Sequence, residues 1–234
     1  MVIRRLEDAT DRPAVRVPPR LWRLPGVYAP QSDSYLLART LSSEPRAVDA
    51  RILDIGAGTG LLSVYAALAG AAHVTAVDVH RRSLLNTRLN AALNRVRVRT
   101  VHGDLTEALP GARFDVVVSN PPYVPAPDDV LPRTGLGRCW DAGRDGRAYL
   151  DRICRDAADL LTPGGVLLLL QSAVCGVDRT RAMLEARDLD VTIAATARIP
   201  FGPVLTERAD MLRKRGMLAP DADREELVVF RAAS

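Results

Sequence analysis

The chain has 234 residues, of which 47% are hydrophobic and 26% charged, so it is too apolar to be wholly disordered and long enough for one large domain. No run approaches the roughly 20 apolar residues that cross a bilayer, and the charged segment 1–11 lacks the apolar core of a secretion signal; we expect a cytoplasmic protein. The net charge of +4 says little about nucleic acid, because Lys214 is the only lysine and the arginine-rich composition is typical of GC-rich coding bias.

Residues 1–46 are rich in proline and arginine and contain one expected helix, at 32–42, with Asp33 or Ser32 near its start. We expect this segment to pack over the rest of a single domain that spans 1–234. From residue 51, short apolar runs alternate with helical stretches, which predicts parallel strands joined by helices. The expected strands are 52–55, 74–77, 96–101, 114–119, 166–171, 191–197 and 227–231, the expected helices are 61–69, 81–93, 147–161 and 177–186, and a turn is expected at 162–165.

The third expected strand differs from the others in its charge. Arg95, Arg97 and Arg99 alternate with Val96 and Val98, a period of two that is typical of an exposed edge strand protected by charge. A stripe that binds nucleic acid is the alternative interpretation, which we favour less.

The stretch 200–226 is longer than a simple connection between strands. Residues 204–215 predict an amphipathic helix that Gly216 ends. It is either an insert that recognises the substrate or a packed connector, and we expect its basic residues 213–215 to be a solvated helix end.

A glycine-rich turn follows the first strand of the alternating region. Asp54 precedes Gly56, Gly58 and Gly60, whereas a dinucleotide fingerprint needs a small residue where Leu61 stands. The pattern resembles motif I of class I methyltransferases that use S-adenosyl-L-methionine (SAM). This resemblance implies SAM as the cofactor, with Asp54 and the three glycines around its methionine part.

Two further acids follow the next two strands. Asp78 stands where a carboxylate can accept both ribose hydroxyls. By the same resemblance, Asp104 accepts from the adenine amino group while Leu105 packs on the ring. Since the carboxyl ends of parallel strands share one edge of a sheet, we expect the three acids there.

The tetrapeptide Asn120-Pro121-Pro122-Tyr123 follows the fourth strand, and its two prolines make the backbone rigid. The Asn120 oxygen can accept one N–H of a planar nitrogen and the Pro121 carbonyl the other, which would orient that nitrogen toward a methyl donor. We expect Tyr123 to stack on the flat acceptor group, and Asn120 also to border SAM. These residues therefore predict methylation of an amide or exocyclic amino nitrogen.

No metal site is expected. Cys139, Cys154 and Cys175 lack a CxxC spacing, so neither a disulfide scaffold nor a cysteine zinc site is indicated. The histidines also lack ligand spacing, and we interpret them as structural or solvated: His73, His80 and His102.

The NPPY form resembles both HemK-type protein-glutamine N5-methyltransferases and nucleic-acid adenine N6-methyltransferases. Two segments favour the short archaeal and eukaryotic form of the first group. Segment 27–37 is similar to its V-Y-x-P-x-x-D-[TS]-x-L-L stretch, where the hydroxyl residue, here Ser34, touches SAM. Segment 140–147 is similar to W-x-G-G-x-[DN]-G-R beside the substrate, which implies substrate contacts for Trp140, Arg144 and Arg147, although Ala142 replaces a usual glycine.

The resemblance implies a Rossmann-like α/β fold with strand order 3-2-1-4-5-7-6 and an antiparallel last strand. It implies transfer of a methyl group to the GGQ-loop glutamine of a peptide-chain release factor, and a small zinc-binding activator subunit as a partner. The N-terminal helical domain of the long bacterial form is not expected here.

Adenine in nucleic acid and a small-molecule amine or amide remain alternative acceptors. A SAM-binding protein without activity is a third alternative. Against a large nucleic acid, the sequence offers no aromatic and basic platform.

Overall fold

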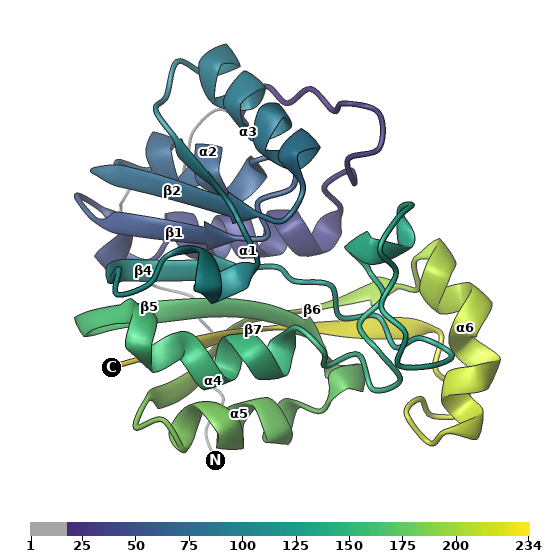
Figure 1. The fold of residues 1–234 in the computed structure, drawn as a ribbon. Helices are drawn as coiled ribbons and strands as arrows, with labels where there is room; N and C mark the ends of the chain where they lie inside the picture. The colour runs from purple at the N-terminus through teal and green to yellow at the C-terminus, as the bar shows by residue number, and fades with distance from the viewer. Residues whose placement is uncertain (1–17) are drawn as a thin grey trace.

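The computed structural model describes residues 18–234 as a twisted seven-stranded sheet between two layers of helices (Figure 1). Residues 1–17 of the predicted N-terminal segment lie outside the described residues. The strand order is β3-β2-β1-β4-β5-β7-β6, and β7 is antiparallel to both neighbours while the other pairs are parallel. The predicted order and fold class are confirmed. The strands are β1 (Arg51–Ile55), β2 (His73–Asp78), β3 (Arg99–His102), β4 (Phe114–Ser119), β5 (Leu161–Ser172), β6 (Asp190–Pro200) and β7 (Arg224–Ala233).

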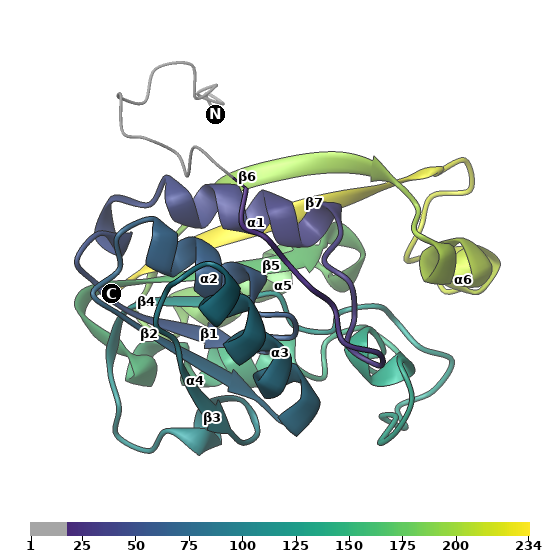
Figure 2. The same cartoon turned by 90° about the horizontal axis from the view of Figure 1, so that it is seen from above.

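Helices α1, α2 and α3 pack together on one face of the sheet, and α4 and α5 pack together on the other (Figures 1 and 2). Each helix expected from the sequence forms, and α1 and α3 have the predicted bounds. Within residues 18–234, no helix is both long and apolar enough to span a membrane. The helices are α1 (Ser32–Ser42), α2 (Leu61–Leu68), α3 (Arg81–Leu93), α4 (Leu150–Leu160), α5 (Val177–Glu185) and α6 (Pro203–Lys214).

The core lies on both faces of the central strands. Residues Val166 to Leu170 of β5 are all fully buried, as are Ile52 and Leu53 of β1 and Phe230 of β7. A strand covered by helices on both faces needs apolar side chains at every position rather than at alternate ones. This requirement explains why β5 is recognisable in the sequence as a continuous apolar run.

Strand β3 is the edge strand that the alternating arginines predicted, but it begins at Arg99 rather than at residue 96. Arg95 has a φ of 57°, and the Val96 amide donates to the Ala91 carbonyl at 3.0 Å. The backbone at 95–96 therefore closes the end of α3 and is not free to pair with β2.

The turn expected at 162–165 is wrong, because these residues belong to β5. They form a bulge: Phe114 pairs with Leu161 and Val116 pairs with Val166, so the extra residues lie on one strand only. A Cβ on Gly165 would lie 2.8 Å from the Thr162 carbonyl oxygen, so glycine permits the close approach that the bulge requires.

Helix α6 lies between β6 and β7, beside the segment that follows β4 (Figure 1). The Arg208 guanidinium donates to the Pro125 carbonyl at 3.0 Å and pairs with Asp141 at 2.5 Å. Through these contacts α6 packs against the segment that follows β4, as expected for a packed connector.

The basic end of α6 is not simply solvated, contrary to expectation. Arg215 donates to the carbonyls of Ala126 at 2.8 Å and Pro127 at 2.7 Å. Arg213 donates to the Ala222 carbonyl at 2.9 Å. Arg215 thus ties the end of the helix to the chain that follows the NPPY tetrapeptide.

Three asparagines one helical turn apart, two on α3 and one directly after it, hold the chain that precedes α1. This chain descends from α3 to α1 in Figure 1. Each amide bonds to backbone groups of residues 20–24, much as a neighbouring strand would. The fully buried Asn90 makes two of these bonds, to Trp22 N at 2.7 Å and Trp22 O at 2.9 Å, and a third bond to Thr59 O at 2.8 Å. Asn86 bonds Leu24 N and Trp22 O, and Asn94 bonds Arg20 N and Arg20 O.

We predict that Asn90→Ala lowers the free energy of unfolding by about 1–3 kcal/mol, because buried backbone groups lose their partners. Asn94→Ala is the matched control and should cost less, since its partners are exposed to water. Chemical denaturation of both variants measures the difference. Equal losses would show that the buried bonds of Asn90 have no special weight.

Candidate functional site

A cavity of about 760 Å³ lies at the carboxyl-terminal edge of β1, β2 and β4, a volume typical of small-molecule sites. This is the edge at which open α/β sheets bind ligands. Seven of the residues singled out in the sequence line it: Ser34, Gly56, Gly58, Asp78, Leu105, Asn120 and Pro122.

The glycine-rich turn forms one wall of the cavity. Gly56 and Gly58 have φ values of 78° and 55°, which favour glycine. A Cβ on Gly56 would meet nothing within 4 Å, so the backbone there borders open space. Gly60 does not line the cavity; its Cβ would lie 2.8 Å from the Thr87 Cα, so this glycine lets α2 pack against α3.

Asp78 is the only one of the three expected acids that lines the cavity. Its Oδ2 accepts from the Gly58 amide at 3.0 Å, and its Oδ1 accepts from the His80 amide at 2.8 Å. The carboxylate therefore fixes the glycine-rich turn, and each oxygen keeps a second lone pair for a ligand.

Asp54 lies beneath the turn and is fully buried. Its Oδ2 accepts from the amide and the hydroxyl of Ser63 at 3.0 and 2.6 Å, while its Oδ1 has no partner among the described residues. Burial raises the pKa of this carboxyl from 3.8 to about 7. Asp54 thus supports the turn and α2 from inside the fold.

Asp104 is half-exposed and does not line the cavity. It pairs instead with Arg152 of α4, at 2.9 Å. The adjacent Leu105 does line the cavity and has a φ of 45°. The structure therefore brings the expected leucine to the site but turns the neighbouring acid to α4.

Asn120 occupies the position that follows β4 and lines the cavity. Its Nδ2 donates to Asp33 Oδ2 at 3.0 Å and to Ser34 Oγ at 3.2 Å. Its Oδ1 is buried and has no hydrogen-bond partner among the described residues. Because a carboxylate only accepts, Asp33 fixes which end of the amide faces it and leaves Oδ1 free.

Tyr123 is buried and does not line the cavity, so the structure does not put its ring where stacking on an acceptor was expected. Its hydroxyl donates to the same Asp33 Oδ2, at 3.1 Å. Burial and the nearby Asp33 charge raise the Tyr123 pKa well above 10, so the phenol stays a donor. From the sequence, Asp33 was expected only near the start of a helix and was given no role in the site, although it is the aspartate of the pattern in segment 27–37.

The other three residues expected to contact substrate, Trp140, Arg144 and Arg147, do not line the cavity either. The Trp140 ring lies 5.7 Å from that of Tyr28, and Arg144 is exposed. Arg147 is only 2% exposed and lies in a network of side chains behind the tetrapeptide. It also lies before α4, which begins at Leu150 and not at 147 as predicted.

Other lining residues gave no signal in the sequence. Residues 130–133 and Cys139 line the cavity, as does His80, which was interpreted as structural or solvated. Arg138 of the same loop lines it too and reaches the Gly26 carbonyl at 3.4 Å. His80 is far in sequence from the other residues, which belong to the loop that follows the tetrapeptide and have no shared pattern.

Within residues 18–234, no group of three or more His, Cys, Asp or Glu side chains is arranged to hold a metal ion.

Residues 19–130 match the family described as methyltransferase small domain. A putative protein N5-glutamine methyltransferase of Methanocaldococcus jannaschii is 36% identical over 188 residues, which cover 79% of this chain and 92% of that relative. The chain belongs to the protein N5-glutamine methyltransferase family. This membership and the fold make it a methyltransferase, and they confirm the resemblance to HemK-type enzymes.

A release factor glutamine methyltransferase of Deinococcus radiodurans is 39% identical over 140 residues, 58% of this chain, but the match spans only half of that relative. Among solved structures, the E. cuniculi Mtq2–Trm112 complex, described as responsible for methylation of the eRF1 translation termination factor, superposes with a TM-score of 0.61. The match is 24% identical and covers 89% of this chain and 99% of that one. This likeness concerns the fold.

We predict that Asp54→Asn changes how stability depends on pH. Because the folded-state pKa of Asp54 is raised to about 7, the wild type loses stability as the pH rises from about 4 to about 7, by up to about 4 kcal/mol. The asparagine variant lacks this titration, so its stability relative to wild type should rise over that range and then stay constant. Denaturant unfolding of both proteins at several pH values measures this; a constant difference would contradict it.

Proposed function

We propose that the protein transfers a methyl group from SAM to the side-chain amide nitrogen of a glutamine, in the GGQ loop of a peptide-chain release factor. The unpartnered Oδ1 of Asn120 carries this proposal. A buried carbonyl oxygen without a partner is costly, and Asn120 borders a cavity large enough for a small-molecule ligand.

The cavity fits SAM. The open backbone at Gly56 suits close approach of a ligand, the Asp78 carboxylate suits ribose hydroxyls, and Leu105 offers an apolar wall for a base. When bound, SAM supplies an electrophilic methyl group on a sulfonium. We propose Ser34, Gly58 and Asn120 as further contacts; the roles of Asp54, Gly60 and Asp104 in binding stay predictions.

The chemistry of the acceptor follows from Asn120. An amide nitrogen is a poor nucleophile because its lone pair is delocalised, so the enzyme must orient it. Asn120 Oδ1 accepts one N–H and the Pro121 carbonyl accepts the other, which directs the lone pair toward the donor and makes a pyramidal nitrogen easier to reach. Asp33 keeps the Asn120 amide in this orientation.

The names of the relatives support a release factor as the acceptor, because they specify glutamine, release factors or eRF1. One hydrophobic core joins the sheet to α1, α2, α4 and α5, which supports a single catalytic domain. It would act on a protein loop that reaches the cavity from outside.

We also propose that a small partner subunit covers one side of the sheet. Leu85, Leu89 and Leu93 follow one another at one-turn intervals on α3 and are 50%, 42% and 37% exposed. They form an apolar stripe beside β3, the edge strand, whose unpaired backbone could pair with another chain. The Mtq2–Trm112 assembly supports such a partner.

We predict that Asn120→Ala lowers methyl transfer by about 100-fold or more, as removal of a positioned polar group does in other enzymes. Peptide mass spectrometry of release factor from the same organism, incubated with SAM, measures the methyl group on the GGQ glutamine. The variant should still bind SAM, though more weakly, because Gly56, Asp78 and Leu105 remain at the cavity; calorimetry measures this affinity and allows transfer to be compared at saturating SAM. Transfer by the variant at the wild-type rate, or methylation of adenine in duplex DNA instead of the glutamine, would contradict the proposal.

For the partner, we predict that Leu89→Arg abolishes co-purification of a small protein with the tagged chain, because a charge would enter the apolar stripe. Leu68→Arg, at an exposed leucine of α2, is the matched control and should retain it. Addition of the recovered subunit should raise methyl transfer by the wild type. Retention of the subunit by the Leu89 variant would place its contact elsewhere.

A further inference from the structure

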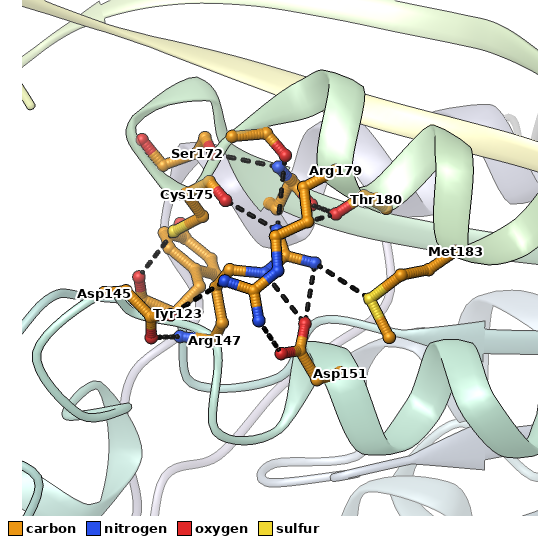
Figure 3. Close-up of polar contacts among 11 residues, drawn as sticks. Tyr123, Asp145, Arg147, Asp151, Ser172, Cys175, Arg179, Thr180 and Met183 are labelled. Carbon is orange, nitrogen blue, oxygen red and sulfur yellow. Dashed lines mark hydrogen bonds and ion pairs between the residues drawn. The ribbon is translucent and has the colours of Figure 1, made fainter.

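Arg147 is a buried cation that the proposed chemistry does not use. Its side chain is 2% exposed and lies between Asp151 and the start of α5 (Figure 3). Its Nε donates to Asp151 Oδ1 at 2.8 Å, and its Nη1 donates to Thr180 Oγ1 at 2.9 Å. Asp151 also pairs with Arg179, so ion pairs hold the guanidinium in one position.

This guanidinium fixes the backbone of Cys175. Arg147 Nη1 donates to the Cys175 carbonyl at 2.5 Å and to the Gly176 carbonyl at 3.2 Å (Figure 3). Thr180 in turn donates to Gln171 of β5 at 2.6 Å, so the network is anchored to the central sheet.

The Cys175 thiol connects this network to the tetrapeptide. Its Sγ donates to the Tyr123 carbonyl at 3.0 Å (Figure 3). Burial raises the pKa of Cys175 well above its usual value, so the thiol keeps the proton that it donates. A Cβ on Gly146, next to Arg147, would overlap the Tyr123 carbonyl oxygen, so this loop also packs directly against the tetrapeptide.

We propose that Arg147 and Cys175 are positioning residues, which hold the Asn120–Tyr123 backbone in the geometry that methyl transfer needs. The inference rests on the proposed function for its effect on the reaction. The Tyr123 hydroxyl is held by Asp33 and its carbonyl by Cys175, so the residue is fixed at both ends. A rigid Tyr123 leaves Asn120 and the Pro121 carbonyl little freedom to move.

Cys175→Ala and Cys175→Ser form the decisive pair, because both shorten the side chain but only serine retains a donor. We expect the alanine variant to lower kcat for methyl transfer about 10-fold while KM for SAM is unchanged, and serine to restore part of the loss. Arg147→Lys keeps the charge but loses the planar guanidinium, so we expect it to lower kcat as Cys175→Ala does.

Hydrogen exchange tests the same inference without any substrate. In the peptide that spans 120–130, the Val124 and Ala126 amides, which bond to Trp140 and Gly143, should exchange about 10-fold faster in the alanine variant. Exchange in the peptide that spans 51–68 should not change, which separates local loosening from global instability.

Two outcomes would overturn the inference. One is a Cys175→Ala variant whose amide exchange and kcat equal those of the wild type. The other is an equal loss of kcat in Cys175→Ser and Cys175→Ala, which would mean that packing alone matters. If the wild type methylates no release factor but exchange in 120–130 still rises in the alanine variant and not in the serine variant, the proposed function fails and the positioning role stands. If Arg147→Lys does not fold, the Cys175 pair still decides.

Discussion

The carboxylate of Asp33 is the constraint on which the site depends. It can only accept hydrogen bonds, so it turns the Asn120 amide nitrogen toward itself and leaves the buried amide oxygen of this cavity-lining residue without a partner among the described residues. The Tyr123 hydroxyl donates to the same oxygen. One acid of α1 thereby fixes both ends of the tetrapeptide that follows β4, and the N-terminal segment becomes part of the site that the sheet creates.

The chain after β4 has little regular structure of its own, so other elements have to hold it. The asparagines of α3 hold the segment that precedes α1, and α6 reaches the carbonyls of residues 125–127 through Arg208 and Arg215. Behind the tetrapeptide, Arg147 and Cys175 connect it to β5 and α5. Each of these contacts comes from a different part of the chain, as is usual where precise geometry is built from irregular backbone.

Much of the fold could be predicted because its signals are local. The apolar run of β5, the bounds of α1 and α3 and the strand order implied by family resemblance were all confirmed. Two strand predictions failed where backbone groups have other partners. The bulge at 162–165 fits against β4, which is distant in sequence, and the Val96 amide binds the Ala91 carbonyl, which closes α3 before β3 can begin. The solvated end expected for α6 was wrong for the same reason, since Arg215 binds carbonyls far away in sequence.

The motifs of the sequence indicated the family, and the resemblance to that family implied the order of the strands. The sequence also predicted the position of the cavity, because the glycine-rich turn, Asp78 and Asn120 each follow a parallel strand at the same edge. Only the tertiary structure decided what each side chain does there. It turned Asp104 toward Arg152, buried Tyr123 and Arg147, and made Asp33 the partner of Asn120. The position of a residue after a strand determines where its backbone lies in the sheet. The direction and the partner of its side chain depend on contacts between segments that only folding brings together.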